Sequence, residues 1–109
     1  MKSNIHYRRS DSDKNPLVLL HGFMESEAIW DKFFNVLGKD RCVITLDLPG
    51  HGQTPQMADV HTMPLMAQCV KDVLDAENID KTTVIGHSMG GYVALEFAYL
   101  YPERVSSFG

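Results

Sequence analysis

Three short strand-like runs, each followed by a helical pattern, constrain most strongly what this chain can fold into. The runs occupy residues 17–20, 42–46 and 82–85, and the first of them, LVLL, is continuously apolar. Continuous rather than alternating hydrophobicity suits a strand that is covered on both faces. Strands that alternate with helices over short connections imply right-handed crossovers. We therefore expect an α/β fold with a mostly parallel sheet and helices on both faces.

The helical patterns lie at residues 29–37, 65–74 and 92–101. In the first two, apolar side chains recur every three or four residues and form one stripe. Ser26 is placed to cap the first helix and Gly38 to end it. The third pattern is apolar on nearly every side, which is typical of a buried helix.

Length and charge exclude several classes of protein. The chain has 109 residues, 44% of them hydrophobic, which is enough for one core and too little for two. The net charge of −4 excludes a nucleic-acid-binding protein that acts through a basic surface. No apolar run approaches the roughly 20 residues of a membrane span, and no apolar segment follows the basic N-terminal residues as in a secretory signal.

The two cysteines indicate the compartment. Cys42 falls in a strand-like run and Cys69 in a helical pattern, 27 positions later. This spacing is neither a CxxC pair nor a disulfide framework. We expect two buried thiols in a reducing cytoplasm, with a bridge between them left open as an alternative.

The pattern G-x-S-x-G, at residues 86–90, carries the chemistry. It stands between the third strand-like run and the third helical pattern. Such a pattern predicts an abrupt strand-to-helix turn with Ser88 in a strained conformation at its apex. Positions 86 and 90 must then be glycine, because side chains there would collide with the strand and the helix. The alternative interpretation is a glycine-rich turn in which Ser88 only caps the helix.

Together with two earlier motifs, this pattern resembles the α/β-hydrolase family. Residues 21–23, HGF, look like the family's HG-x loop. Residues 47–54, DLPGHGQT, look like its D-x-x-G-x-G-x-S loop, with Thr54 where serine is usual, and residues 86–91, GHSMGG, match its nucleophile elbow. The resemblance runs from about Leu17 to the last residue. It implies that Ser88 is the nucleophile and that the backbone N–H groups of Phe23 and Met89 form the oxyanion hole.

The remaining polar residues of these motifs have structural interpretations. We expect His21 to be bonded within its own loop, His51 to shape the turn at Pro49, and Asp47 to anchor its loop rather than to be the triad acid. His87 is adjacent to Ser88 but is not its base, because neighbours on a tight turn point apart. His6 and His61 lie in polar segments without a motif. Phe23, Met24 and Met89 are candidates to line an apolar acyl pocket, and the two methionines have gap filling in the core as an alternative role.

A serine hydroxyl needs a base and an orienting acid, and in this family both follow the elbow. Here the chain ends 21 residues after Ser88, with only Glu96 and Glu103 as acids and no histidine. Residues 105–108 look like the beginning of a further strand. We therefore expect residues 1–109 to be the N-terminal portion of a single, incomplete α/β-hydrolase domain that lacks its C-terminal strands. Alone it would be inactive and would expose the strand at 82–85 as an apolar edge prone to self-association.

The resemblance implies a serine hydrolase for carboxylic esters, thioesters or similar small acyl substrates, without a cofactor or metal. Two alternatives remain open. One is a carbon–carbon bond hydrolase or lyase-type synthase resembling the menaquinone-pathway enzyme, which carries a similar HGF…DLPGHG…SMGG set. The other is a non-catalytic ligand-binding protein on a hydrolase scaffold. The chain has no dinucleotide fingerprint, P-loop or HExxH motif, and its histidines lack metal-ligand spacing.

Overall fold

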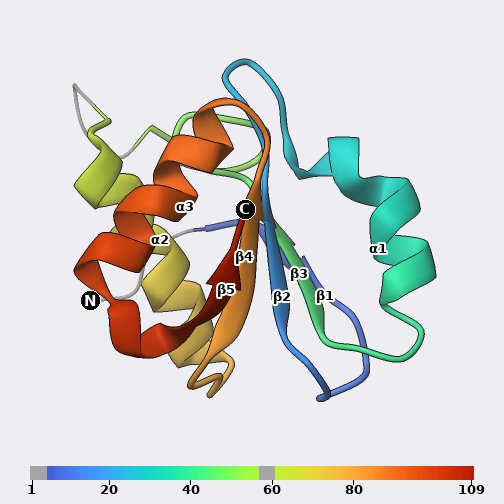
Figure 1. The fold of residues 1–109 in the computed structure, drawn as a ribbon. Coiled ribbons are helices and arrows are strands. Elements are labelled where there is room, and N and C mark those ends of the chain that lie inside the picture. The colour runs from blue at the N-terminus through green and yellow to red at the C-terminus, as the bar shows by residue number, and fades with distance from the viewer. Residues whose placement is uncertain (1–4, 57–60) are drawn as a thin grey trace.

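Five strands form one sheet in the order β1-β3-β2-β4-β5 (Figure 1). The computed structural model describes residues 5–56 and 61–109, so that residues 1–4 and 57–60 lie outside the described residues. The strands are Tyr7–Arg9 (β1), Leu17–Leu20 (β2), Val43–Leu46 (β3), Thr82–Gly86 (β4) and Val105–Phe108 (β5).

The sheet is mostly parallel, as the alternation of strands and helices predicts. β2 pairs in parallel with β3 and with β4, and β4 pairs in parallel with β5. Only β1 runs antiparallel, against β3. The carboxyl ends of β2, β3 and β4 therefore meet at one edge, which is where ligands bind in open α/β sheets.

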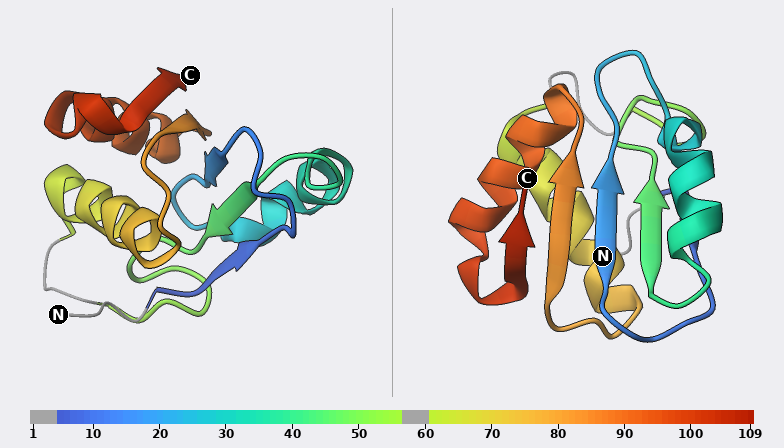
Figure 2. Two further views of the ribbon diagram at one scale, coloured as in Figure 1. Left: turned by 90° about the horizontal axis from the view of Figure 1, so that it is seen from below. Right: turned by 45° about the vertical axis from the view of Figure 1, so that its right-hand side comes forward.

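Helices cover both faces of the sheet, as expected. Asp31–Leu37 (α1) lies on one face, whereas Met63–Ala76 (α2) and Met89–Leu100 (α3) pack side by side on the other (Figure 2). Two short 3-10 helices, Glu27–Trp30 (η1) and Pro102–Arg104 (η2), precede α1 and β5.

The central strand β2 divides the core in two. Leu17 and Leu19 pack with Val43 toward α1, whereas Val18 and Leu20 belong to the larger cluster formed with α2 and α3. All four side chains of β2 are buried, because successive side chains on a strand point to opposite faces and both faces are covered. The continuous LVLL pattern is therefore explained by the two helical layers.

The prediction of one helix over residues 29–37 is wrong in part. Ser26 does cap its start, by accepting a hydrogen bond from the Ala28 N–H, and Gly38 does end it. However, the segment begins as the 3-10 helix η1 and becomes α-helical only at Asp31. Ile29 and Phe33 are exposed, because a change from three to 3.6 residues per turn breaks the single apolar stripe.

The sheet edge also differs from the expectation. The strand at 82–85 is not an edge, because β5 pairs with β4 along Thr82, Thr83 and Val84. Helix α3 begins at Met89, three residues before the predicted start. Only one side of α3 is buried, and Tyr92, Leu95 and Tyr99 are exposed, so this helix is less covered than its all-round apolar pattern predicts.

Both cysteines are buried reduced thiols, as expected, and no disulfide joins them. Burial raises the pKa of the Cys69 thiol to about 11. Among the helices at residues 5–56 and 61–109, none combines the length and the apolar character needed to cross a membrane.

Candidate active site

Ser88 stands at the apex of the turn between β4 and α3, hereafter the Ser88 turn (residues 86–90). Its backbone has φ 57° and ψ −115°, a strained conformation for a residue with a side chain. The side chain is exposed and makes no capping hydrogen bond to α3, contrary to the interpretation of Ser88 as a helix cap. It faces a hollow of about 570 Å³ that is also lined by Gly91, Tyr92 and Leu95.

Two glycines make this turn possible. A Cβ atom on Gly86 would lie 2.0 Å from the carbonyl oxygen of Gly90, and one on Gly90 would lie 2.4 Å from that of Leu20. Both contacts are with backbone atoms, which no side-chain rotation relieves. Gly91 differs, because a Cβ there would lie 3.5 Å from the nearest atom, Gly86 O. The sterics expected from the motif thus apply to Gly86 and Gly90.

The loop after β2, hereafter the Gly22 loop (residues 21–25), lies against the Ser88 turn. A Cβ on Gly22 would be 3.2 Å from the Ser88 Cβ and 3.2 Å from the His87 carbonyl oxygen. Within the described part of the chain, neither the Phe23 N–H nor the Met89 N–H donates a hydrogen bond to a protein group. The Met89 N–H is at the first position of α3, where an amide has no partner within the helix.

The Gly22–Phe23 peptide has a defined orientation. The Gly22 carbonyl oxygen accepts hydrogen bonds from the His21 Nδ1–H, at 2.7 Å, and from the Glu25 N–H, at 3.2 Å. Because a trans peptide directs its C=O and N–H in opposite directions, the Phe23 N–H points away from both donors. An amide that is fixed in this way can meet a developing negative charge without reorganisation.

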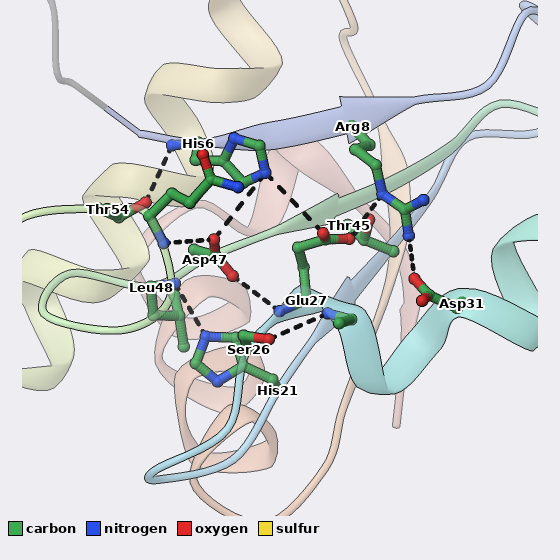
Figure 3. A network of polar contacts seen from close by, with 12 residues as sticks. His6, Arg8, His21, Ser26, Glu27, Asp31, Thr45, Asp47, Leu48 and Thr54 are labelled. Atoms are coloured by element: carbon green, nitrogen blue, oxygen red, sulfur yellow. Dashed lines mark hydrogen bonds and ion pairs between the residues drawn. The ribbon is translucent and has the colours of Figure 1, made fainter.

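His21 connects two loops. It is fully buried, and its Nε2 accepts a hydrogen bond from the Leu48 N–H at 3.0 Å, so the ring proton is assigned to Nδ1 (Figure 3). Burial lowers the pKa of the imidazole, which favours the neutral tautomer that both bonds require. His21 is bonded to its own loop, as expected, and also to the loop after β3.

Asp47 anchors the loop after β3. Its carboxylate accepts hydrogen bonds from the Glu27 N–H, at 2.8 Å, and from the Gln53 N–H, at 2.9 Å. Gly52 adopts φ 53°, and a Cβ there would overlap the Asp47 carboxylate. Asp47 is buried, and its carboxylate connects the loop after β3 to the start of η1 (Figure 3).

These motif positions can now be compared with known proteins. The sequence profile of the alpha/beta hydrolase fold family matches residues 15–108. The chain belongs to the alpha/beta hydrolase fold family. The E. coli (strain K12) protein "Esterase YbfF" is 37% identical over 107 residues, which are 96% of this chain and 42% of that protein.

Two further proteins illustrate the range of relatives. A "2-hydroxy-6-oxononadienedioate/2-hydroxy-6-oxononatrienedioate hydrolase" from Paraburkholderia phymatum is 35% identical over 106 residues, 93% of this chain and 37% of that protein. The solved structure of a marine microorganism esterase superimposes with a TM-score of 0.91 at 29% identity, over 98% of this chain and 41% of that one. This α/β hydrolase chain thus spans about two fifths of each protein.

His51 and His6 of this α/β hydrolase each make a hydrogen bond with a residue of the loop after β3. His51 donates from Nδ1 to the Pro49 carbonyl oxygen at 3.0 Å, as a turn-shaping residue would. Its ring also lies edge-on to that of Phe23, with centroids 5.8 Å apart, a contact that the sequence does not indicate. The His6 N–H donates to the Thr54 hydroxyl, so the threonine found where the family usually has serine still supplies a buried acceptor.

The three apolar candidates for the acyl pocket lie in two different places. Phe23 and Met24 are strongly exposed and line a hollow of about 460 Å³ together with His51 and His61. Met89 instead packs against the main core, so its side chain fills a gap there.

Sequence reasoning missed Glu25. Its Oε1 accepts a hydrogen bond from the Gly22 N–H at 2.6 Å and lies 3.1 Å from the His87 Nδ1. These two contacts lower the pKa of Glu25, the Gly22 amide most strongly. Glu25 reaches Gly22 only because Met24 adopts φ 65° and turns the loop back. No sequence signal marks a methionine for that conformation.

Within residues 5–56 and 61–109, no histidine is hydrogen-bonded to Ser88. His87 is directed to Glu25 instead, as expected for a residue next to the apex of a tight turn. The same residues contain no cluster of three or more histidine, cysteine or acidic side chains that could hold a metal ion.

Proposed function

We propose that this α/β hydrolase is a serine hydrolase that acts on carboxylic esters, thioesters or similar small acyl substrates, with Ser88 as the nucleophile. The observation that carries the proposal is the Ser88 turn, where an exposed serine on a strained backbone lies against the Gly22 loop, and where the Phe23 and Met89 amides have no protein partner among the described residues. The esterases among its relatives support the same class of reaction.

In the proposed reaction the Ser88 Oγ attacks the acyl carbon and loses its proton to a general base. The carbonyl π electrons move onto the oxygen, and the Phe23 and Met89 N–H groups donate hydrogen bonds to the resulting oxyanion. Removing one such donor typically costs about 3 kcal/mol of transition-state stabilisation. The tetrahedral intermediate collapses and expels the alcohol or thiol, which takes up the proton. Water then cleaves the acyl-enzyme by the same steps.

The base and its orienting acid belong to the proposal rather than to the described residues. We place them in the remainder of a single hydrolase domain of which residues 1–109 form the N-terminal portion. The absence of a histidine bonded to Ser88 in the described segments supports this placement. Residues 1–109 by themselves should then show no burst with an activated ester. A burst that Ser88→Ala abolishes would refute this part of the proposal.

A carbon–carbon bond hydrolase remains the second candidate. It is favoured by the relative named as a hydrolase of a hydroxy-oxo dienedioate, a substrate class that carries an oxo group and two carboxylates. The non-catalytic scaffold has no comparable support, because an unused strained turn would cost stability without a function.

Steady-state kinetics separate these candidates. The protein produced from its complete reading frame should hydrolyse p-nitrophenyl acetate, and Ser88→Ala should lower kcat by about 10³-fold or more. Ser107→Ala, which replaces another exposed serine, should leave kcat unchanged. Turnover of a vinylogous diketone acid with little ester hydrolysis would favour the second candidate, and no turnover of either class would favour the scaffold.

We propose two further properties of the protein. One is a location in a reducing cytoplasm, which the buried, reduced thiols fit. Self-association through a sheet edge would involve β5 rather than β4, since β5 is the last strand of the described sheet. Size-exclusion chromatography of residues 1–109 over a concentration series tests the second property.

A further inference from the structure

The Gly22 loop has few apolar anchors. Phe23 and Met24 are 68% and 81% exposed, so their side chains contribute little to holding the loop. Met24 also adopts φ 65°, a conformation that costs energy for a residue with a side chain. The position of the loop must therefore depend on its polar contacts.

Those contacts converge on one peptide group and one carboxylate. The Gly22 carbonyl is held from the buried side by His21, and the Gly22 N–H donates to Glu25 Oε1 at 2.6 Å. A hydrogen bond to an ionised acceptor is stronger than a neutral one. Glu25 thus holds Gly22 through its N–H, and the Gly22 carbonyl shares a peptide group with the Phe23 N–H.

The same carboxylate oxygen also reaches the Ser88 turn. His87, the residue before Ser88, has its Nδ1 3.1 Å from Glu25 Oε1. The Gly22 loop follows β2 and the Ser88 turn follows β4, so this contact joins elements 62 positions apart in the chain. The Glu25 side chain is 31% exposed and that of His87 58%.

We propose that Glu25 is a positioning residue that clamps the Gly22 loop to the Ser88 turn and thereby keeps the Phe23 N–H aimed at the oxyanion. The proposal rests on the proposed function, because it assigns Glu25 a role in the reaction at Ser88. Glu25 acts as a hydrogen-bond acceptor and takes no proton from the substrate. His87 has the second role of donating to the carboxylate, which offsets part of a negative charge that would otherwise oppose the oxyanion.

This role predicts a specific split in the kinetics. The clamp affects the transition state, in which the oxyanion forms, more than the ground state. In the protein produced from its complete reading frame, Glu25→Ala should lower kcat for p-nitrophenyl acetate by about tenfold or more and leave KM within about twofold. Glu25→Gln keeps an oxygen that can accept from both Gly22 and His87, so kcat should stay within about threefold of the wild-type value.

Two controls accompany these variants. Glu103→Ala removes an exposed carboxylate elsewhere in the chain and should change neither kcat nor KM. The Gly22 amide proton, followed by ¹⁵N-resolved NMR, should resonate far downfield in the wild type and in Glu25→Gln, and should move upfield in Glu25→Ala. This second measurement reports the bond directly and does not depend on turnover.

Each result decides the proposal. A tenfold loss of kcat in Glu25→Ala that Glu25→Gln restores supports it. It is overturned if Glu25→Ala keeps its kcat while Ser88→Ala loses activity, an outcome that leaves the proposed function intact. Equal losses in Glu25→Ala and Glu25→Gln, or a loss that tracks a lowered melting temperature with a raised KM, also overturn it. Activity that survives Ser88→Ala overturns the proposed function and the role of Glu25 with it.

Discussion

Replacing Gly90 by alanine should be far more damaging than the same change at Gly91, its neighbour. A Cβ on Gly90 would lie 2.4 Å from the Leu20 carbonyl oxygen and 2.6 Å from that of His21, whereas an ordinary contact starts at 3.4 Å. Helix α3 and the end of β2 would have to separate by about 1 Å, and overpacking of this kind costs about 1–3 kcal/mol. Because both opposing atoms belong to the backbone, we expect the upper end, about 3 kcal/mol.

Gly91 provides a matched control. It lies in the same turn of α3, and its Cβ would meet nothing closer than 3.5 Å. Alanine in a helix is more stable than glycine by about 0.5–1 kcal/mol, so Gly91→Ala should be neutral or stabilising. The two substitutions should therefore differ by about 4 kcal/mol in the free energy of unfolding.

Urea unfolding measures this difference. Unfolding is monitored by the fluorescence of Trp30 and by far-UV circular dichroism. With an m-value of about 2 kcal/mol/M, the urea midpoints of the two variants should lie about 2 M apart. Equal midpoints, or a lower midpoint for Gly91→Ala, would refute the close approach of α3 to β2. In that case the geometry of the Ser88 turn would have to be abandoned as well.

Three further predictions concern the framework around the site. Asp47→Ala leaves one buried and one partly buried N–H donor without an acceptor and should lower the free energy of unfolding by about 2–5 kcal/mol, whereas a wild-type urea midpoint would contradict its role as anchor. The hydrogen bond to Glu77 raises the pKa of Tyr7 to about 12. The stabilising contribution of this bond is therefore complete below pH 10 and is lost as the pH rises through about 12. The absorbance at 295 nm that Tyr7→Phe removes should titrate near pH 12 in the folded chain, and a midpoint near 10 would argue against the bond. Cys42 and Cys69 should not react with Ellman's reagent at pH 8 until the chain is unfolded, when both should react, and fast labelling of the folded protein would contradict their burial.

Much of the architecture can be predicted from local pattern. The continuous apolar run at β2 indicates two covered faces, and both layers are present. The turn at Ser88 follows from glycines whose hydrogens are the only substituents that fit. These features depend on sterics and periodicity, which short stretches of sequence contain.

The remaining features depend on residues far apart in the chain. The pairing of β5 with β4 is absent from any local pattern, since residues 105–108, VSSF, alternate weakly and are joined to β4 through α3. Likewise, Glu25 meets His87 only after two loops have been folded onto one sheet edge. A glutamate that follows two exposed apolar residues looks like a solvated residue until its partner is placed beside it.

Covalent labelling at Ser88 tests the central claim most directly. The protein produced from its complete reading frame is treated with a fluorophosphonate, digested, and analysed by peptide mass spectrometry. We predict one stoichiometric phosphonyl adduct, located on Ser88 and absent from Ser88→Ala, with Ser107→Ala labelled as fully as the wild type. An unmodified Ser88 in folded protein, or an adduct on a different side chain, would contradict the assignment of Ser88 as the nucleophile.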